Sequence, residues 1–257
     1  MWNFIRITVL LLVLAVVAGV TWIDKATTTS WKKTLWVGIF PMNADGSAVT
    51  DSYVRSLKVE DFASIEKFFA DEAGRYGVSL SRPIHIELYP GPSEMPPVLP
   101  PNANAIVATI WSLKMRLYAR HAADVPGRAP SQIRVFVLFH DPAVSENVPH
   151  SLGLQKGLVG VVHAFADRGM RGQNNIVIAH ETMHTVGATD KYDLRTGEPL
   201  FPEGYANPAR TPRLPQDKAE IMAGERPVSD THHEMPEDLP GEAVGHKTAV
   251  EIGWIKQ

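Results

Sequence analysis

The chain of 257 residues contains no cysteine. Disulfide bonds, thiolate metal ligands and cysteine nucleophiles are therefore excluded, so a metal site in this protein has to use His, Asp or Glu. The sequence also lacks an excess of basic charge, since 25 Lys and Arg residues stand against 28 Asp and Glu residues. This balance offers no basic surface to a phosphate backbone, and we expect no nucleic-acid partner.

Charged side chains are also missing from residues 7–23, an almost entirely apolar run between Arg6 and Asp24. The run is at the short end of what a membrane-spanning helix needs, and Arg6 before it is typical of the cytoplasmic side. We interpret residues 1–23 as a retained signal-anchor or as a cleaved signal peptide. Both interpretations place the rest of the chain outside the cytoplasm, and the first makes the membrane a partner.

After a polar tether at residues 24–34, the sequence predicts alternating strands and helices. Four apolar or alternating runs predict strands, at residues 35–40, 84–89, 133–139 and 158–165. We expect Pro41 to end the first strand, because proline cannot donate to a strand ladder. Two segments with helical spacing of apolar residues lie at 59–76 and 104–122. The second has one apolar stripe, formed by Ile106, Ile110, Leu113 and Leu117.

The chain changes in character after residue 190. Polar, proline-rich stretches follow, and only a short closing helix is expected, at residues 246–255. We therefore expect an α+β fold in a single domain, residues 35–257. Its mixed α/β half would span residues 35–187 and its loop-rich half residues 188–257, with a ligand site in the cleft between them.

The motif HExxHxxGxxD begins at His180. On a helix, His180 and His184 share one face, so both imidazoles reach one metal ion. Glu181 lies beside the first ligand, where it reaches a metal-activated water as general base. Gly187 permits the left-handed residue that ends a helix, after which Asp190 supplies a third ligand. Three protein ligands and one open position are typical of a catalytic zinc site.

This motif resembles the signature of the metzincin clan of zinc metallopeptidases, HExxHxxGxxH followed by a methionine-containing turn. The first four signature residues match position by position. Asp190 stands in place of the usual third His, as in the snapalysin-like and immune-inhibitor-A-like branches. Met222, in Ile221-Met222-Ala223-Gly224, resembles the methionine of that turn. We also expect Asn174 or Asn175 to cap the helix that carries the histidines.

The resemblance implies a two-subdomain architecture. The N-terminal subdomain would hold a twisted, mostly parallel sheet, and residues 158–165 would be its antiparallel edge strand, which binds substrate. The C-terminal subdomain would carry the Met-turn. The function implied is that of a zinc-dependent endopeptidase, which hydrolyses peptide bonds of a peptide or protein through a metal-activated water with Glu181 as general base.

Two alternatives remain for the function and several for single residues. The first alternative is a non-catalytic zinc-binding module on the same scaffold. The second is a zinc amidohydrolase that acts on a non-peptide amide of the cell wall. Ala223 and Gly224 stand where many metzincins carry a transition-state Tyr, and Tyr192 and Tyr205 are candidates to replace it. Asp193 is a supporting acceptor for a ligand His, an alternative third ligand, a Ca²⁺ carboxylate or an exposed turn residue.

Overall fold

The computed structural model describes residues 6–8, 28–100, 102–145, 147–155 and 157–256. Of the segment expected to be an N-terminal anchor, only residues 6–8 lie within these ranges. In this described part of the chain, no helix is both long enough and apolar enough to cross a membrane. The predicted signal-anchor itself therefore stays a prediction.

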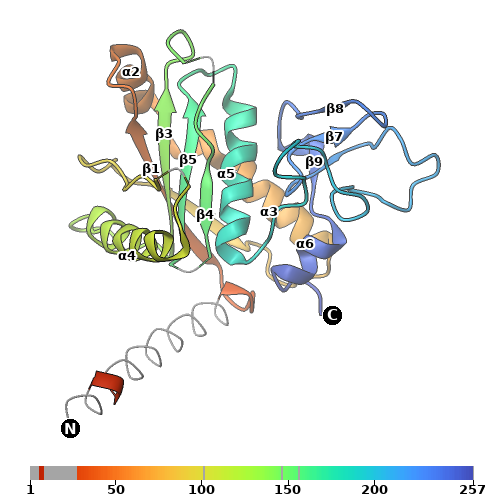
Figure 1. Cartoon of the computed structure of the whole chain (residues 1–257), viewed down its shortest axis with the longest axis horizontal. Helices are drawn as coiled ribbons and strands as arrows, with labels where there is room; N and C mark the ends of the chain where they lie inside the picture. The colour runs from red at the N-terminus through yellow and green to blue at the C-terminus, as the bar shows by residue number, and fades with distance from the viewer. Residues whose placement is uncertain (1–5, 9–27, 101, 146, 156, 257) are drawn as a thin grey trace.

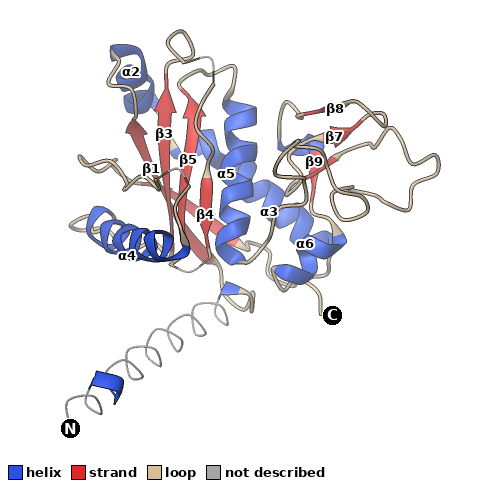
Figure 2. Ribbon diagram, in the orientation of Figure 1, coloured by secondary structure: helices blue, strands red, loops and turns tan. Residues whose placement is uncertain are grey.

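The core of the fold is a five-stranded sheet in the order β2-β1-β3-β5-β4 (Figures 1 and 2). Four strands run parallel: β1 (Leu35–Asn43), β2 (Ile84–Leu88), β3 (Ile133–His140) and β5 (Val159–Phe165). The short β4 (Leu152–Leu154) pairs antiparallel with β5 at one edge. A mixed α/β fold with a mostly parallel sheet and an antiparallel edge strand is thus confirmed.

The identity of the edge strand was predicted wrongly. Residues 158–165 were expected at the edge, but β5 pairs with β3 on one side and with β4 on the other. The edge is formed instead by β4, which is the short segment Leu152-Gly153-Leu154. Three residues are too few for the alternation of apolar and polar side chains that predicts a strand.

Strand β1 also runs past Pro41, where it was expected to end. On the β2 side, the carbonyl of Ile39 accepts a hydrogen bond from the amide of Tyr89. Residues two apart in a strand face the same way, so the nitrogen of Pro41 points past the end of β2. Gly91 lies against the Pro41 carbonyl there, and no ladder bond is lost.

Helices cover both faces of the sheet. On one face lie α3 (Ala63–Arg75) and α5 (Arg171–Val186), which share one apolar core with the sheet. On the other face lies α4 (Ala105–Ala122), which builds a second core with residues such as Phe40 and Phe136 (Figure 1). The predicted helix 59–76 is a short 3-10 turn, η1 (Val59–Phe62), followed by α3. A further helix, α2 (Ala48–Ser56), was not predicted.

The apolar stripe of α4 does not face the core. The buried side of the helix consists of Trp111, Met115 and Ala119, which lie opposite to that stripe. Trp111 fixes this orientation by donating from its indole Nε1 to the carbonyl of Pro97, at 2.8 Å. The four aliphatic residues of the predicted stripe are exposed (Ile106, Ile110, Leu113 and Leu117).

The C-terminal half contains little regular structure, as predicted. Its strand pairs are β6 (Ala219–Glu220) with β9 (Glu242–Ala243), and β7 (Arg226–Pro227) with β8 (His233–Glu234). A 3-10 turn, η2 (Leu239–Gly241), and the closing helix α6 (His246–Glu251) complete it. The helix is shorter than the expected residues 246–255.

The predicted tether at residues 24–34 is only partly a tether. Thr28 and Trp31 are both buried. The indole Nε1 of Trp31 donates to the carbonyl of Ile252 at 2.7 Å, and the ring meets Trp254 edge-on. Residues from 28 onward therefore belong to the folded domain, and residues 24–27 lie outside the described part of the chain.

Candidate metal centre

Helix α5 carries the histidines, and it begins earlier than predicted. Its first residue is Arg171, so Asn174 and Asn175 lie inside the helix, where both are buried. The side chain of Asn174 exchanges two hydrogen bonds with the backbone of Phe165, and Asn175 donates to the carbonyl of Asp61. The asparagines therefore fasten the helix to its neighbours and do not cap it.

The end of α5 is as predicted. Gly187 is the C-terminal cap and adopts a left-handed conformation with φ of 113°. Residues with a Cβ are strained there, whereas glycine is not. The turn reverses the chain so that Asp190 returns to the helix.

Three side-chain atoms converge at this point. Nε2 of His180 and Nε2 of His184 lie 3.0 Å apart. Oδ1 of Asp190 lies 3.2 Å from the first and 3.1 Å from the second. Ligand atoms about 2.0–2.1 Å from a tetrahedral zinc ion would lie roughly 3.3 Å apart, so the spacing of these three atoms fits such an ion closely.

Backbone carbonyls fix which nitrogen of each imidazole carries its proton. Nδ1 of His180 lies 2.8 Å from the carbonyl of Ile221, and Nδ1 of His184 lies 2.9 Å from the carbonyl of Ala188. A carbonyl only accepts, so both Nδ1 atoms donate, and in the neutral rings both Nε2 atoms carry lone pairs. Asp190 Oδ1 brings a third lone pair. Three acceptors that face one another require a cation or an added proton between them.

The pKa values show the same requirement. Burial lowers the pKa of His180, but the contact with Asp190 and the charge of Glu181 outweigh it and raise that pKa to about 9. Burial raises the pKa of Asp190, yet its contacts with the two histidines bring that pKa well below its ordinary value. Without a metal ion, a proton on His180 supplies the positive charge, and a bound cation would displace it.

Glu181 lies beside this cluster without a partner of its own. The residue is buried, and its Oε2 has no hydrogen-bond partner within the described residues. Burial raises the pKa of Glu181, although the charges of His180 and His184 oppose the shift. A buried carboxylate with a raised pKa and one oxygen free of hydrogen bonds among the described residues is suited to accept a proton near neutral pH.

Sequence reasoning missed Gly153, which places the edge strand β4 directly against α5. A Cβ at this position would lie 2.4 Å from Cβ of His184 and 3.0 Å from Oε2 of Glu181. Only glycine fits without displacing the site. The pattern Leu-Gly-Leu was the one available signal in the sequence, and it is too short to be specific.

The predicted Met-turn lies against the same histidine. Ile221, Met222 and Ala223 are buried in a turn, and the carbonyl of Ile221 is the one that accepts from His180. The carbonyl of Met222 accepts from the amide of Lys191 at 2.8 Å. The turn thus connects the first histidine with the segment that follows Asp190.

A buried carboxylate, which sequence reasoning missed, holds this turn in place. Glu220 is fully buried, and its carboxylate accepts from the amide of Met222 at 2.7 Å. It also accepts from the amide of Gly245 at 2.9 Å and from the hydroxyl of Thr248 at 2.7 Å. Glu220 therefore ties the turn to the start of α6.

A second buried charge, also missed, positions Asp190. Lys191 is 2% exposed, and its Nζ donates to Glu251 on α6 at 2.8 Å and to the carbonyl of Thr189 at 2.6 Å. The amide of Thr189 donates to the same carboxylate. Both neighbours of Asp190 are therefore fixed to α6.

Asp193, the alternative candidate for the third ligand, lies away from the histidines. Asp193 Oδ1 accepts from the amides of Arg195 and Thr196, which closes a turn, and the structure brings Asp190 to the histidines, not Asp193. In the described residues, the one group of three His, Cys, Asp or Glu side chains recorded as close enough to share a metal ion consists of His180, Glu181 and His184. Support for a separate Ca²⁺ site is therefore lacking there.

The two candidate tyrosines, Tyr192 and Tyr205, differ in their surroundings. The ring of Tyr192 lies 6.5 Å from that of His180. Burial, and then the charges of Asp190 and Glu181, raise the pKa of Tyr192 to about 12, so its hydroxyl keeps its proton. Tyr205 packs edge-on against Phe201 instead. Tyr192 is therefore the one of the pair that lies near the cluster.

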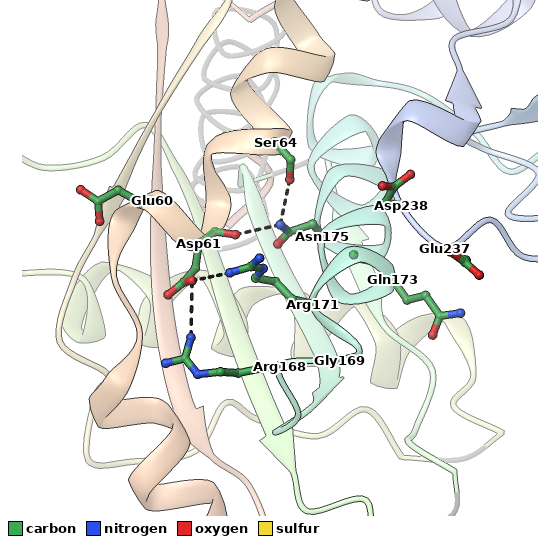
Figure 3. A pocket seen from close by; sticks show the side chains of 11 residues that line it. Glu60, Asp61, Ser64, Arg168, Gly169, Arg171, Gln173, Asn175, Glu237 and Asp238 are labelled. Atoms are coloured by element: carbon green, nitrogen blue, oxygen red, sulfur yellow. Dashed lines mark hydrogen bonds and ion pairs between the residues drawn. The ribbon is translucent and has the colours of Figure 1, made fainter.

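A hollow of about 670 Å³ at the start of α5 does not include the cluster (Figure 3). Asp61 pairs there with Arg171 at 3.0 Å and with Arg168 at 3.8 Å. Asn175 also donates to Ser64 Oγ. These pairs fasten α5 to η1 and α3, and we assign no ligand to the hollow.

A scan against models of known protein families gives no match to this chain, and a search of curated proteins finds no similar sequence. Its function is therefore inferred from the geometry of the site.

Proposed function

We propose that this protein is a zinc-dependent endopeptidase. The observation that carries the proposal is the convergence of three lone pairs, on His180, His184 and Asp190, beside the buried and unpartnered carboxylate of Glu181. Two imidazole nitrogens and one carboxylate oxygen are a ligand set that zinc accepts, and a fourth position would remain open. We further propose a metzincin-like architecture, which the mostly parallel sheet and the buried turn at Met222 support.

The three ligands would hold one zinc ion. When bound, the ion would polarise a substrate carbonyl and lower the pKa of a coordinated water. Carbonyl groups of Ile221 and Ala188 keep the ring protons on Nδ1, which leaves both Nε2 atoms available. Lys191 and Glu251 hold the segment around Asp190 at the distance that the cluster needs.

Glu181 would move the proton. Its carboxylate takes the proton of the attacking water, and the protonated acid then passes that proton to the nitrogen of the leaving amine as the peptide C–N bond breaks. The raised pKa of Glu181 favours both steps, since the acid form has to persist between them. Tyr192 lies nearer to the cluster than Tyr205, and its hydroxyl is protonated at neutral pH. It is therefore the candidate to donate a hydrogen bond to the developing oxyanion.

An extended peptide would bind along β4. In the described part of the sheet, β4 is paired on one side alone, so its other edge offers backbone groups to a substrate strand. Gly153 on this strand touches Glu181 and His184, which would bring a paired peptide next to the proton acceptor. We therefore propose β4 as the substrate strand, in place of residues 158–165.

The experiment compares the full chain loaded with zinc against Glu181→Gln and the exposed control Glu203→Gln on a diverse peptide library. We expect cleavage by the wild type and the control, loss of cleavage with a chelator, and a decrease of about 10²–10⁴-fold for Glu181→Gln with zinc still bound. Full cleavage by zinc-loaded Glu181→Gln would remove that residue from its role. Bound zinc with no peptide cleaved in any variant would favour the non-catalytic module or the amidohydrolase.

We also propose that residues 1–23 anchor the protein to the membrane or direct its export, with the site outside the cytoplasm. Fractionation tests this directly. Protein that sediments with membranes and resists high salt is expected from a retained anchor, whereas a mature N-terminus near residue 19 is expected after cleavage. A full-length chain in the soluble cytoplasmic fraction would contradict both.

A further inference from the structure

Helix α4 presents an apolar face to solvent. Its four aliphatic residues are 71%, 50%, 50% and 59% exposed, in the order Ile106, Ile110, Leu113 and Leu117. They recur at intervals of four, three and four, so they form one continuous stripe. The helix already buries its opposite side on the sheet, so this stripe is not needed for the domain core. Contiguous exposed apolar patches of this kind mark interaction surfaces.

The charges on α4 differ from those of the rest of the chain. The helix, Ala105–Ala122, contains no Asp or Glu, although the whole chain carries a net charge of −3. Its exposed basic residues are Lys114, Arg120 and His121. Lys114 and Arg120 lie on opposite flanks of the apolar stripe at helical spacing. Cations on both sides of an apolar stripe are typical of helices that lie in the surface of an anionic bilayer.

The loop before α4 also carries exposed apolar side chains. Met95 is 47% exposed and Val98 is 85% exposed. The loop is held to the helix by two hydrogen bonds, from Trp111 to the carbonyl of Pro97 and from the hydroxyl of Tyr118 to the carbonyl of Glu94. These apolar side chains are therefore carried by a loop that is fixed to α4.

The point where the described domain begins, at Thr28, bears on the same face of the molecule. The apolar N-terminal run ends at Ile23, and Thr28 is already packed on the domain. Five residues span at most roughly 18 Å, so the end of the run cannot lie far from Thr28. The chain then enters β1 at Leu35, and α4 lies at the end of the sheet where β1 begins (Figure 1).

We propose that the exposed face of α4 docks on the surface of an anionic lipid bilayer. The four aliphatic residues would enter the boundary between headgroups and acyl chains, and Lys114 and Arg120 would reach the anionic headgroups. Together with the proposed N-terminal anchor, this second attachment would fix how the domain lies on the membrane. The proposal does not depend on zinc or on peptidase activity.

A unique thiol makes the test direct, because the chain has no cysteine. Leu113→Cys in the full chain is labelled with an environment-sensitive fluorophore and reconstituted into unilamellar vesicles that contain phosphatidylserine and a lipid-borne quencher. Val144→Cys is the control, since Val144 is 71% exposed and follows β3 at the opposite end of the sheet. We expect strong quenching by lipid at position 113 and none at position 144.

Two further arms distinguish other occupants of this face. Replacement of Ile110 and Leu117 by Glu should abolish lipid quenching at position 113, and each of Lys114→Glu and Arg120→Glu should reduce the docked population about fivefold or more. Protection of position 113 from a water-soluble quencher without lipid quenching would mean that the N-terminal run or a second copy covers α4, and would overturn the proposal. If the fluorophore at position 113 is quenched by the water-soluble quencher and not by the lipid-borne one, the proposal is overturned as well.

Discussion

Residues 35–187 and residues 188–257 are stabilised by different interactions. The first half surrounds its sheet with large, fully buried apolar side chains such as Phe40, Phe69 and Phe136. The second half has little regular structure and, beside apolar side chains such as Ile221 and Ile252, buries ionisable groups, among them Lys191, Glu220 and Glu242. Apolar packing tolerates changes in pH, whereas a buried charge is favourable only with its partner and in one protonation state.

The candidate metal centre joins the two halves. The histidines and Glu181 come from α5 of the first half, whereas Asp190 and the turn at Met222 come from the second. The first half therefore supplies the proposed proton acceptor and two of the proposed ligands, and the second half supplies the proposed third ligand. Conditions that disturb the buried charges of the second half should weaken metal binding before they unfold the sheet.

The largest effect is expected in the apolar half. Phe136 is fully buried, with ring centroids of Phe40 and Tyr118 each at 5.1 Å. Phe136→Ala should lower the free energy of unfolding by about 3–5 kcal/mol, because it leaves a cavity in a packed core. Urea denaturation at several pH values should give the same loss at each. The exposed change Val144→Ala should stay within about 0.5 kcal/mol.

In the charged half, Lys191→Met should destabilise the protein by about 3 kcal/mol and weaken zinc binding. The change leaves the carboxylate of Glu251, 16% exposed, without its buried partner. Lys247 is the matched control, since it lies 3.9 Å from the same carboxylate but is 42% exposed. Lys247→Met should cost no more than about 0.5 kcal/mol. Equal losses in the two variants would show that burial does not decide the effect.

Glu242 should make stability depend on pH. Both of its carboxylate oxygens are buried with no hydrogen-bond partner among the described residues. Burial, and then the charge of Glu220, raises the pKa of Glu242 from 4.5 to about 8. Between those pH values the folded state retains a proton that the unfolded state releases. Stability should therefore fall as pH rises through this window, by about 1.4 kcal/mol per pH unit at most, and level off above pH 8.

Glu242→Gln removes this titration, so its unfolding free energy should fall less steeply than that of the wild type from pH 5 to pH 8. Urea denaturation at intervals of one pH unit measures both slopes. The exposed change Glu203→Gln should retain the wild-type slope. Parallel curves for Glu242→Gln and wild type would show that Glu242 is ionised in the folded protein.

The smallest effect is expected from alanine substitutions at two glycines that face each other across β4 and β5. Gly153 and Gly160 are register partners. A Cβ on Gly153 would lie 2.4 Å from His184, whereas one on Gly160 would lie 3.5 Å from Val135, an ordinary contact. Gly153→Ala should reduce zinc affinity or peptide cleavage about tenfold, equivalent to about 1.4 kcal/mol. Gly160→Ala should leave both within about twofold, and equal effects would contradict the assigned packing.

Local patterns predicted much of the apolar half. Four of its five strands and helices α3 and α4 follow from apolar periodicity over several residues, whereas α5 was predicted from the spacing of its histidines. The same pattern misled at α4, because Trp111 and Met115 form a second apolar side, and periodicity does not tell which side meets the sheet. Helix α2 was missed because its single large buried side chain, Tyr53, makes no stripe.

The candidate site was predictable where its residues lie close together in sequence. The spacing from His180 to Asp190 covers the proposed ligands, and Gly187 ends the helix as expected. The supporting residues were not predictable, because Gly153, Glu220 and Glu251 reach the site from distant parts of the chain. Nothing local distinguishes a buried carboxylate that holds a turn from an exposed one.

Metal binding by single ligand variants tests the proposed centre most directly. The full chain, stripped with a chelator, is titrated with zinc in parallel with Asp190→Ala and Asp193→Ala. We expect one zinc ion per chain for the wild type and for Asp193→Ala, with release of protons, and an affinity at least about 100-fold lower for Asp190→Ala. Zinc binding by Asp190→Ala equal to that of the wild type, or its loss in Asp193→Ala, would contradict the assignment of the three ligands.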